Sequence, residues 1–389
     1  MEGEIIKLTE LWFSVFISLC FCYWISKVVP TGTKRLVCVI PIICLYLFLP
    51  LTISSVHFGG IVGFFIAWLA NFKLLLFAFG KGPLASDPSI SLPRFIALAC
   101  LPIKIQQNSP QKQTPRSKIT QNSNQFDQNG KISSQNPQEE HKKSQIEKNP
   151  DRESKQNPST TKGYMTFLQY AIKGVTLAIM VKIYEYSDHI HPKLILGLYC
   201  FHVYFLLELI LAMVAALARS ILGMELEPQF NNPLLSTSLQ DFWGRRWNLM
   251  VSSILRPTVY EPTLVAGKRL IGPKWAPLPA VLGTFMVSAL MHELIFYYMG
   301  RKDPTFRMTW FFLLHGFCLT VEMALKKSLT ARWQLPRLIS GPLTAGFVIT
   351  TCFWLFIPEF IRCQIDVRAF EEYAALGAFA KNVTQVFLI

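Results

Sequence analysis

A histidine and a glutamate stand side by side in an apolar stretch of the chain, residues 287–300, which read VSALMHELIFYYMG. His292 lies about 14 residues into its apolar run, which at about 1.5 Å per residue of helix is on the order of 20 Å from the start of the run. An ionisable side chain at that depth costs a few kcal/mol or more and normally faces a cavity or a partner. We expect a neutral histidine there, which can accept a proton from a substrate.

The neighbouring Glu293 raises the alternative of a zinc site, because HE opens the metalloprotease pattern HExxH. Phe296 occupies the position of the second histidine, so this helix face offers no pair of zinc ligands. The nine cysteines add no CxxC pair. We therefore expect no metal and no cofactor. Glu293 points about 100° away from His292 around a helix and is expected to bond another helix or to lie near the membrane surface.

A second group of candidates lies in residues 231–262, a stretch that is polar, basic and aromatic together. Trp243 and Trp247 are four positions apart, so they share one helical face, which suits the membrane interface. Arg245 and Arg246 are candidates for holding the phosphates of a soluble anionic donor, because guanidinium presents a planar fork of hydrogen-bond donors. The alternative for both arginines is that they hold the segment on the cytosolic side, next to anionic headgroups.

Four further ionisable residues fall within apolar runs: His202, Glu208, His315 and Glu322. His315 and Glu322 are seven positions apart, two turns along one helical face, so they could meet the same polar partner. For all four we expect hydrogen bonds that tie helices together and no catalytic role.

The chain that must position these residues has the composition of a membrane protein. It is 51% hydrophobic and 16% charged over 389 residues, against roughly 25% charged residues in soluble domains. Eight apolar runs approach the length of about 20 residues that a helix needs to cross the hydrocarbon layer. The sequence predicts an all-α polytopic protein with about eight spans, in a range of roughly seven to nine. The runs are 11–29, 36–55, 57–79, 164–186, 194–218, 278–299, 306–325 and 339–361.

The run 164–186 is the weakest of the eight, because Lys173 and Lys182 interrupt it. Before it, residues 104–163 are rich in Gln, Asn, Ser, Lys and Pro, and such a segment buries too little apolar surface to offset its chain entropy. We predict a disordered cytosolic insert at 104–163, between N-terminal membrane helices in 1–103 and a catalytic core in 164–389. It is either a regulatory arm or a tolerated loop insertion, and we favour the second.

The net charge of +14 comes from Lys and Arg in the connections between apolar runs, so it predicts orientation in a membrane and no binding of nucleic acid. Basic connections after the first, third, fifth and seventh runs are expected to be cytosolic, with the acidic N-terminus in the lumen. The loop at Arg301 and Lys302 opposes this assignment, because the same count makes it lumenal.

The segment LQDFWGRRWN, followed downstream by ALMHELIFYY, resembles the membrane-bound O-acyltransferase family. NPLLSTSLQDFWGRRWN and FIALACLPIKI are similar to its plant wax synthase branch, and the resemblance extends from the first run to the last, apart from the insert. It implies a helical bundle with a buried catalytic cavity, His292 as catalytic base and Asn248 as its companion. It also implies acyl-CoA as co-substrate and a multi-pass location in the endoplasmic reticulum membrane.

The expected reaction is formation of a wax ester from acyl-CoA and a long-chain fatty alcohol. A neutral His292 takes the hydroxyl proton as the oxygen attacks the thioester carbonyl. Asn248 orients an intermediate or hydrogen-bonds the carbonyl as negative charge develops. Trp243, Arg245, Arg246 and Trp247 are the expected contacts to acyl-CoA or lipid. The site is expected to exclude water, because hydrolysis would waste the activated donor.

Acylation of a sterol and acetylation of diacylglycerol are alternatives within the same chemistry. A polytopic transporter with an intramembrane proton relay is the alternative of another class. It is disfavoured because the sequence shows no inverted repeat and no paired helices broken by Gly or Pro. The sequence leaves the oligomeric state open.

Overall fold

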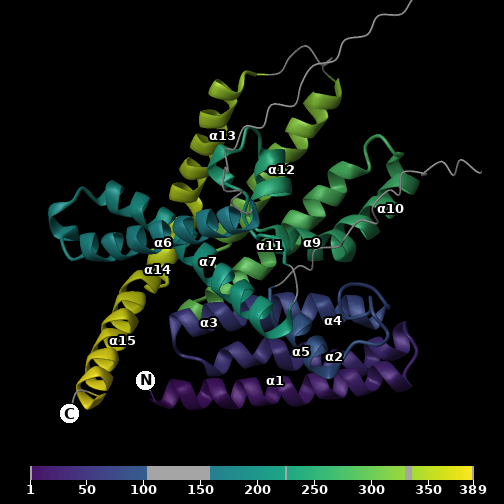
Figure 1. The fold of residues 1–389 in the computed structure, drawn as a ribbon. Coiled ribbons are helices and arrows are strands. Elements are labelled where there is room, and N and C mark those ends of the chain that lie inside the picture. Colours follow the sequence, from purple (N-terminus) through teal and green to yellow (C-terminus); the bar gives the residue numbers. More distant parts are fainter. Residues whose placement is uncertain (1, 103–157, 224–225, 329–334, 388–389) are drawn as a thin grey trace, which may run out of the picture. The chain divides into compact units, whose positions relative to one another are not determined.

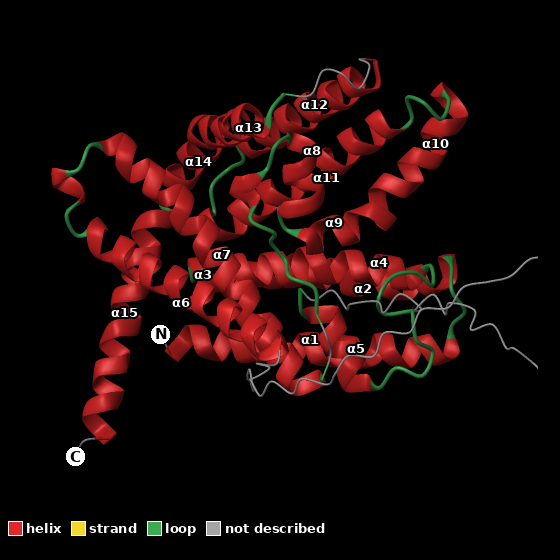
Figure 2. Cartoon of the chain, turned by 45° about the horizontal axis from the view of Figure 1, so that its top comes forward, coloured by secondary structure: helices red, strands yellow, loops and turns green. Residues whose placement is uncertain are grey.

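The regular secondary structure of the protein is helical wherever the structure describes it (Figure 2). The computed structural model describes residues 2–102, 158–223, 226–328 and 335–387. The predicted all-α fold is therefore confirmed. Residues 103–157, which hold most of the predicted insert, lie outside the described part of the chain. Helix α6 begins at Pro158, so residues 158–163 of the predicted insert are helical.

Seven helical stretches of the described residues are long and apolar enough to cross a membrane. This confirms a multi-pass membrane protein, and the number lies within the predicted range. The stretches are Gly3–Val28, Thr33–Thr52, Val56–Ala78, Pro192–Ser220, Pro277–Gly300, Arg307–Ser328 and Arg337–Arg362. The remaining expected span, residues 164–186, lies largely within helix α6 (Pro158–Tyr184), which is not among the seven.

Two compact units divide the chain, one made of residues 1–106 and 171–389 and the other of residues 107–170. Within the first unit, the later part of α6 lies antiparallel to α7 (Pro192–Leu222). The Tyr184 ring is 5.7 Å from that of His202, and Lys173 forms an ion pair with Glu208. The expected role of Glu208 in joining two helices is confirmed. The pairing also explains how a charged lysine is accommodated between helices.

The N-terminal helices pack around a shared apolar core (Figure 1). They are α1 (Glu2–Val28), α2 (Thr33–Phe48), α3 (Val56–Val62), the π-helical η2 (Gly63–Ala70), α4 (Asn71–Ala78) and α5 (Leu92–Cys100). Lys73 is fully buried among them and donates to the carbonyls of Leu98 at 2.7 Å and Leu101 at 2.6 Å. These bonds satisfy carbonyls that the end of α5 leaves free.

The remaining helices follow α7 in the chain, and α11 and α12 pack closely against each other. Close packing of α11 on α12 depends on Gly316, because a Cβ there would lie 2.8 Å from the Cβ of Phe285. These elements are α8 (Leu239–Asp241), η5 (Phe242–Arg246), α9 (Leu249–Leu255), η6 (Arg256–Tyr260), α10 (Glu261–Ile271), α11 (Pro277–Gly300), α12 (Arg307–Ser328), α13 (Arg337–Thr351), η7 (Cys352–Phe356), α14 (Ile357–Arg362) and α15 (Ile365–Phe387).

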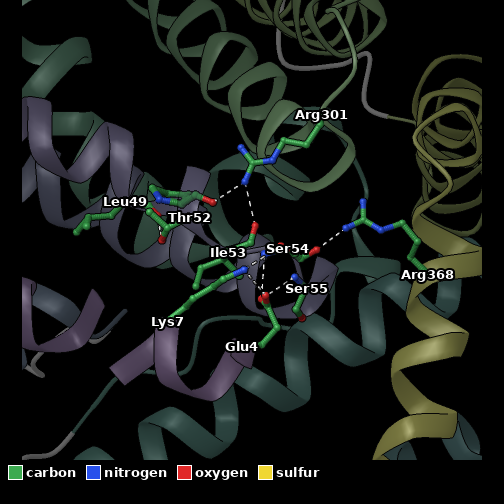
Figure 3. A network of polar contacts seen from close by, with 10 residues as sticks. Glu4, Lys7, Leu49, Thr52, Ile53, Ser54, Ser55, Arg301 and Arg368 are labelled. Carbon is green, nitrogen blue, oxygen red and sulfur yellow. Dashed lines mark hydrogen bonds and ion pairs between the residues drawn. The ribbon is translucent and has the colours of Figure 1, made fainter. Parts of the chain in front are cut away.

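A polar network at one end of the bundle holds the connection between η1 (Leu49–Thr52) and α3 (Figure 3). Arg301, at the end of α11, donates to the carbonyls of Pro50 and Ile53, each at 2.9 Å. Glu4 accepts from the backbone of the same connection, and Arg368 of α15 donates to it. Arg301 therefore lies at the same end as the start of α1. The guanidinium of Arg301 is hydrogen-bonded within the protein. This explains why a basic residue occurs in a loop that the distribution of positive charge assigns to the lumen.

Candidate active site

A cavity of about 410 Å³ lies among α3 and η2, α7, η5 and α9, α11, α12 and the elements from α13 to α15. His292 and Asn248, the two predicted catalytic residues, both line it, as do Trp243 and Trp247. The other lining side chains are mostly aliphatic or aromatic. The structure thus brings two distant parts of the sequence, residues 243–248 and 292, to the wall of one apolar chamber.

The ring of His292 is held in one tautomer by its own helix. Its Nδ1 lies 2.7 Å from the carbonyl oxygen of Ser288, and since a carbonyl can only accept, Nδ1 must carry a hydrogen. A neutral imidazole then has its lone pair on Nε2, and no described residue forms a hydrogen bond with that atom. The ring packs against Phe312 at 4.1 Å and against Trp68 at 5.2 Å between centroids. In the neutral ring, this arrangement leaves Nε2 of His292 as a hydrogen-bond acceptor.

Asn248 stands at a sharp change of direction in the backbone. Its φ of 38° and ψ of 67° are left-handed, a conformation that asparagine tolerates better than most residues. Its Oδ1 accepts from the backbone N–H of Val251 at 3.4 Å and caps α9. The carboxamide oxygen thus stabilises the helix, and no described residue accepts from the amide nitrogen. That leaves the amide as a donor for a cavity ligand.

Trp243 is fixed by a hydrogen-bonded chain through a second histidine. The indole Nε1–H donates to Nδ1 of His315 at 3.1 Å, and Nε2 of His315 lies 2.8 Å from Oγ1 of Thr351. Because Thr351 itself donates to the carbonyl of Phe347, His315 carries its hydrogen on Nε2. Both nitrogens of His315 are occupied, so its expected structural role is confirmed, and what it supports is a residue of the cavity wall.

Trp247 lies in an aromatic cluster with Tyr204, at 5.8 Å, and Phe242, at 5.4 Å, both nearly parallel to it. The ring of Trp243 is 6.2 Å away. The sequence predicted that both tryptophans suit the membrane interface. The structure places them in the wall of the cavity, because η5 turns the segment inward before α9 begins.

The two arginines of the motif have different environments. Arg246 donates from Nε to Asp241 at 2.7 Å and from Nη1 to the carbonyls of Asn231 and Asn232. It holds the loop that carries the motif. Arg245 is exposed. Neither arginine lines the cavity, and Arg245 is the more exposed of the two.

The remaining ionisable candidates are mainly structural. Glu293 accepts from the N–H of Thr309 at 3.0 Å and from its hydroxyl, which confirms the expected bond to another helix. Glu322 accepts from the N–H of Leu239 at 2.8 Å. The prediction that His315 and Glu322 share one partner is wrong. His315 bonds Trp243 and Glu322 bonds Leu239, because the two side chains are two helical turns apart and reach different residues of the segment that begins with α8.

Some cavity residues were not singled out from the sequence. Trp68 and Phe312 flank His292, but in apolar runs full of aromatics nothing distinguishes them. His57 and Tyr373 also line the cavity. His202, which the sequence did single out, lines it too and lies within hydrogen-bond distance of Tyr373. Among the residues the structure describes, no group of three or more His, Cys, Asp or Glu is placed to hold a metal ion.

Comparison with known proteins assigns this arrangement to a family. A model described as "Membrane bound O-acyl transferase family" matches residues 226–314, a range that includes Asn248 and His292. The chain is 48% identical over 375 residues to "Acyl-CoA--sterol O-acyltransferase 1" of Arabidopsis thaliana, covering 96% of each chain. It is 39% identical over 383 residues to "Long-chain-alcohol O-fatty-acyltransferase" of Simmondsia chinensis, covering 98% of this chain and 97% of the relative. It is also 39% identical over 386 residues to "Probable long-chain-alcohol O-fatty-acyltransferase 1" of Arabidopsis thaliana, covering 99% of each. The chain therefore belongs to the membrane-bound O-acyltransferase family and is an acyltransferase.

Proposed function

We propose that the protein transfers an acyl group from acyl-CoA to the hydroxyl of a lipid alcohol, with His292 as the general base. One observation carries the proposal. In His292 the Nδ1–H is held by the Ser288 carbonyl, which leaves Nε2 as a proton acceptor on an apolar cavity. The family membership argues against the transporter alternative.

In the proposed reaction, Nε2 of His292 takes the hydroxyl proton as the alcohol oxygen forms a bond to the thioester carbon. The carbonyl oxygen becomes negative, and the amide N–H of Asn248 donates to it. When the C–S bond breaks, the CoA thiolate takes the proton back from His292, which gives the ester and CoA thiol. The aromatic wall, which includes Trp243 and Trp247, excludes water that would hydrolyse the donor.

Acyl-CoA is proposed to approach from the cytosolic side, in the endoplasmic reticulum membrane. Arg245 is the proposed contact for its phosphates, since its side chain is exposed and guanidinium binds phosphate well. Arg246 instead positions the motif through Asp241.

Two acceptors have specific support. The sequence motifs predict a long-chain fatty alcohol, giving a wax ester, and relatives at 39% identity carry that substrate in their names. The relative at 48% identity is named a sterol acyltransferase. On that higher identity we propose a sterol as the first acceptor to test and a long-chain fatty alcohol as the second. Diacylglycerol acetylation is the third alternative.

The test is expression in yeast that lacks neutral-lipid synthesis, followed by assays of microsomes with labelled acyl-CoA and each acceptor in turn. We expect ester from a sterol or a fatty alcohol, and loss of nearly all ester with His292→Ala. The exposed His189 in η3 (Ser187–His189) provides a matched control, and His189→Ala should keep wild-type activity. Undiminished ester formation by His292→Ala would contradict the role of this base. Absence of ester with every acceptor would contradict the proposed reaction.

A further inference from the structure

A second polar cluster lines the cavity away from His292. It consists of His57 in α3, His202 in α7 and Tyr373 in α15, all of which line the cavity. From His57 to Trp68, which touches His292, the chain runs eleven residues along one continuous helix. At about 1.5 Å per residue, the two polar parts of the cavity are roughly 15 Å apart.

The ring of His57 is fixed by a carboxylate. Glu372 lies 2.6 Å from its Nδ1 and also accepts from the N–H groups of Val56 and His57 and from the hydroxyl of Ser55. Because Glu372 accepts four bonds, Nδ1 of His57 is a donor. In the neutral ring Nε2 is then an acceptor, and no described residue bonds to it.

The second histidine, His202, determines whether the hydroxyl of Tyr373 donates or accepts in the hydrogen bond between them. Nε2 of His202 is 3.2 Å from that hydroxyl oxygen, while Nδ1 of His202 is buried with no described partner. A buried N–H without an acceptor is rarer than an unused acceptor. The hydrogen therefore lies on Nε2, which donates to Tyr373. The hydroxyl hydrogen of Tyr373 then has no acceptor among the described residues.

This cluster presents one acceptor and one donor side by side. The rings of His57 and Tyr373 are 4.8 Å apart, so a single group could use both. An alcohol hydroxyl donates one hydrogen bond and accepts others, which matches this pair. Leaving both polar groups without a partner in an apolar chamber would be unfavourable. We propose that His57, His202 and Tyr373 form a second subsite of the cavity that binds a hydroxyl of the lipid acceptor.

The surrounding structure holds this subsite rigid. The connection before α3 is fixed by Glu4, Arg301 and Arg368 (Figure 3), and Arg368 lies one turn before Glu372 on α15. The subsite is at the end of the bundle where α1 begins, whereas His292 lies deeper. A lipid alcohol has its hydroxyl at the membrane surface, and moving that hydroxyl into hydrocarbon without a partner is costly. The subsite offers hydrogen-bond partners to the hydroxyl as it moves from the membrane surface toward His292.

The inference rests on the proposed function, and its test is a binding measurement that needs no turnover. In a His292→Ala background, a photoreactive long-chain alcohol is competed by an alcohol and by the alkane of equal length. We expect the alcohol to compete better, and Tyr373→Phe to reduce that preference about 3- to 10-fold, the effect of one or two hydrogen bonds. Tyr186→Phe, at an exposed tyrosine outside the cavity, is the matched control. An unchanged preference in both Tyr373→Phe and His57→Phe would overturn the inference.

Kinetics of the His292-containing enzyme distinguish the source of the hydroxyl. If the reacting hydroxyl docks here as the acceptor enters, Tyr373→Phe raises KM for a monohydroxy acceptor and leaves kcat nearly unchanged. If a second hydroxyl of the acceptor docks here, the variant raises KM for a 1,ω-diol only. Either result supports the subsite, and an equal KM for both acceptors in variant and wild type contradicts it. Failure of the proposed function would instead appear as absence of ester from the wild type while the binding preference persists.

Discussion

At the scale of single residues, hydrogen bonding decides which histidine can do chemistry. His315 and His292 both lie in apolar helices, and the rings of both pack against aromatic side chains. Both nitrogens of His315 are occupied, by Trp243 and Thr351, so it has no free lone pair for a substrate. His292 has one nitrogen bonded to Ser288 and one available. The difference lies in the neighbours of each ring and not in the residue type.

Asn248 has a structural role in capping α9 and a proposed chemical role as a donor to the carbonyl oxygen. Substitution by glycine tests the two roles separately. Glycine adopts the left-handed conformation freely and costs only a few tenths of a kcal/mol as a helix cap. Asn248→Gly should therefore keep near wild-type thermal stability in detergent but lose turnover by on the order of 10²–10³-fold, the effect of one lost donor to a developing oxyanion. Asn248→Ala should lose stability as well, by about 1–2 kcal/mol. Wild-type turnover by Asn248→Gly would show that the amide takes no part in the reaction.

At the scale of elements, π-helical segments shape the cavity. Of the π segments in the described residues, η2, η5 and η7 each contribute lining residues, among them Trp68, Trp243 and Phe356. A π turn is wider than an α turn and shifts the side chains that follow, and such turns are frequent at functional sites. The apolar runs predicted helices here, but hydropathy carries no information on where an extra residue enters a turn.

The close packing of α11 on α12 leads to a prediction at this scale. Gly316→Ala would place a Cβ 2.8 Å from the Cβ of Phe285, and overpacking of this kind costs about 1–3 kcal/mol. We expect a lower thermal midpoint in detergent. We also expect lower activity, because Phe285 lines the cavity and packs on Trp243. Gly346→Ala in α13 is the control, since no atom lies within 4 Å of a Cβ there. Equal stability of Gly316→Ala and wild type would contradict this packing argument.

At the scale of the whole molecule, the ends of the helices define two sides of the membrane. Helix α11 begins after the basic connection that contains Lys268 and Arg269 and ends at Arg301, beside the connection before α3. His202, in the first third of α7, bonds Tyr373, whose neighbour Glu372 caps α3. The turn between α6 and α7 therefore lies toward the same end as Arg301.

This arrangement predicts the orientation. A flexible insertion carrying an Asn-Gly-Thr glycosylation acceptor should be glycosylated when placed at Asp188 or at Asp303, and should remain unmodified at Gly272, because the basic connections stay in the cytosol. A mobility shift removed by endoglycosidase is the measurement. The opposite pattern would reverse the orientation, and modification at Asp303 but not at Asp188 would mean that α6 does not bring the chain across.

The sequence by itself determined the helical membrane class and the positions of seven spans, because apolar runs of sufficient length are a local property. It also indicated His292 and Asn248 through the motifs that contain them, and it predicted a structural role for Glu293 from its direction on the helix. Tertiary structure decided which nitrogen of His292 is free and that Arg246 is paired internally. It also brought His57 to Tyr373, 316 positions away along the chain. These depend on which helices pack together and on the partners each polar group then meets, and hydropathy and spacing do not contain that information.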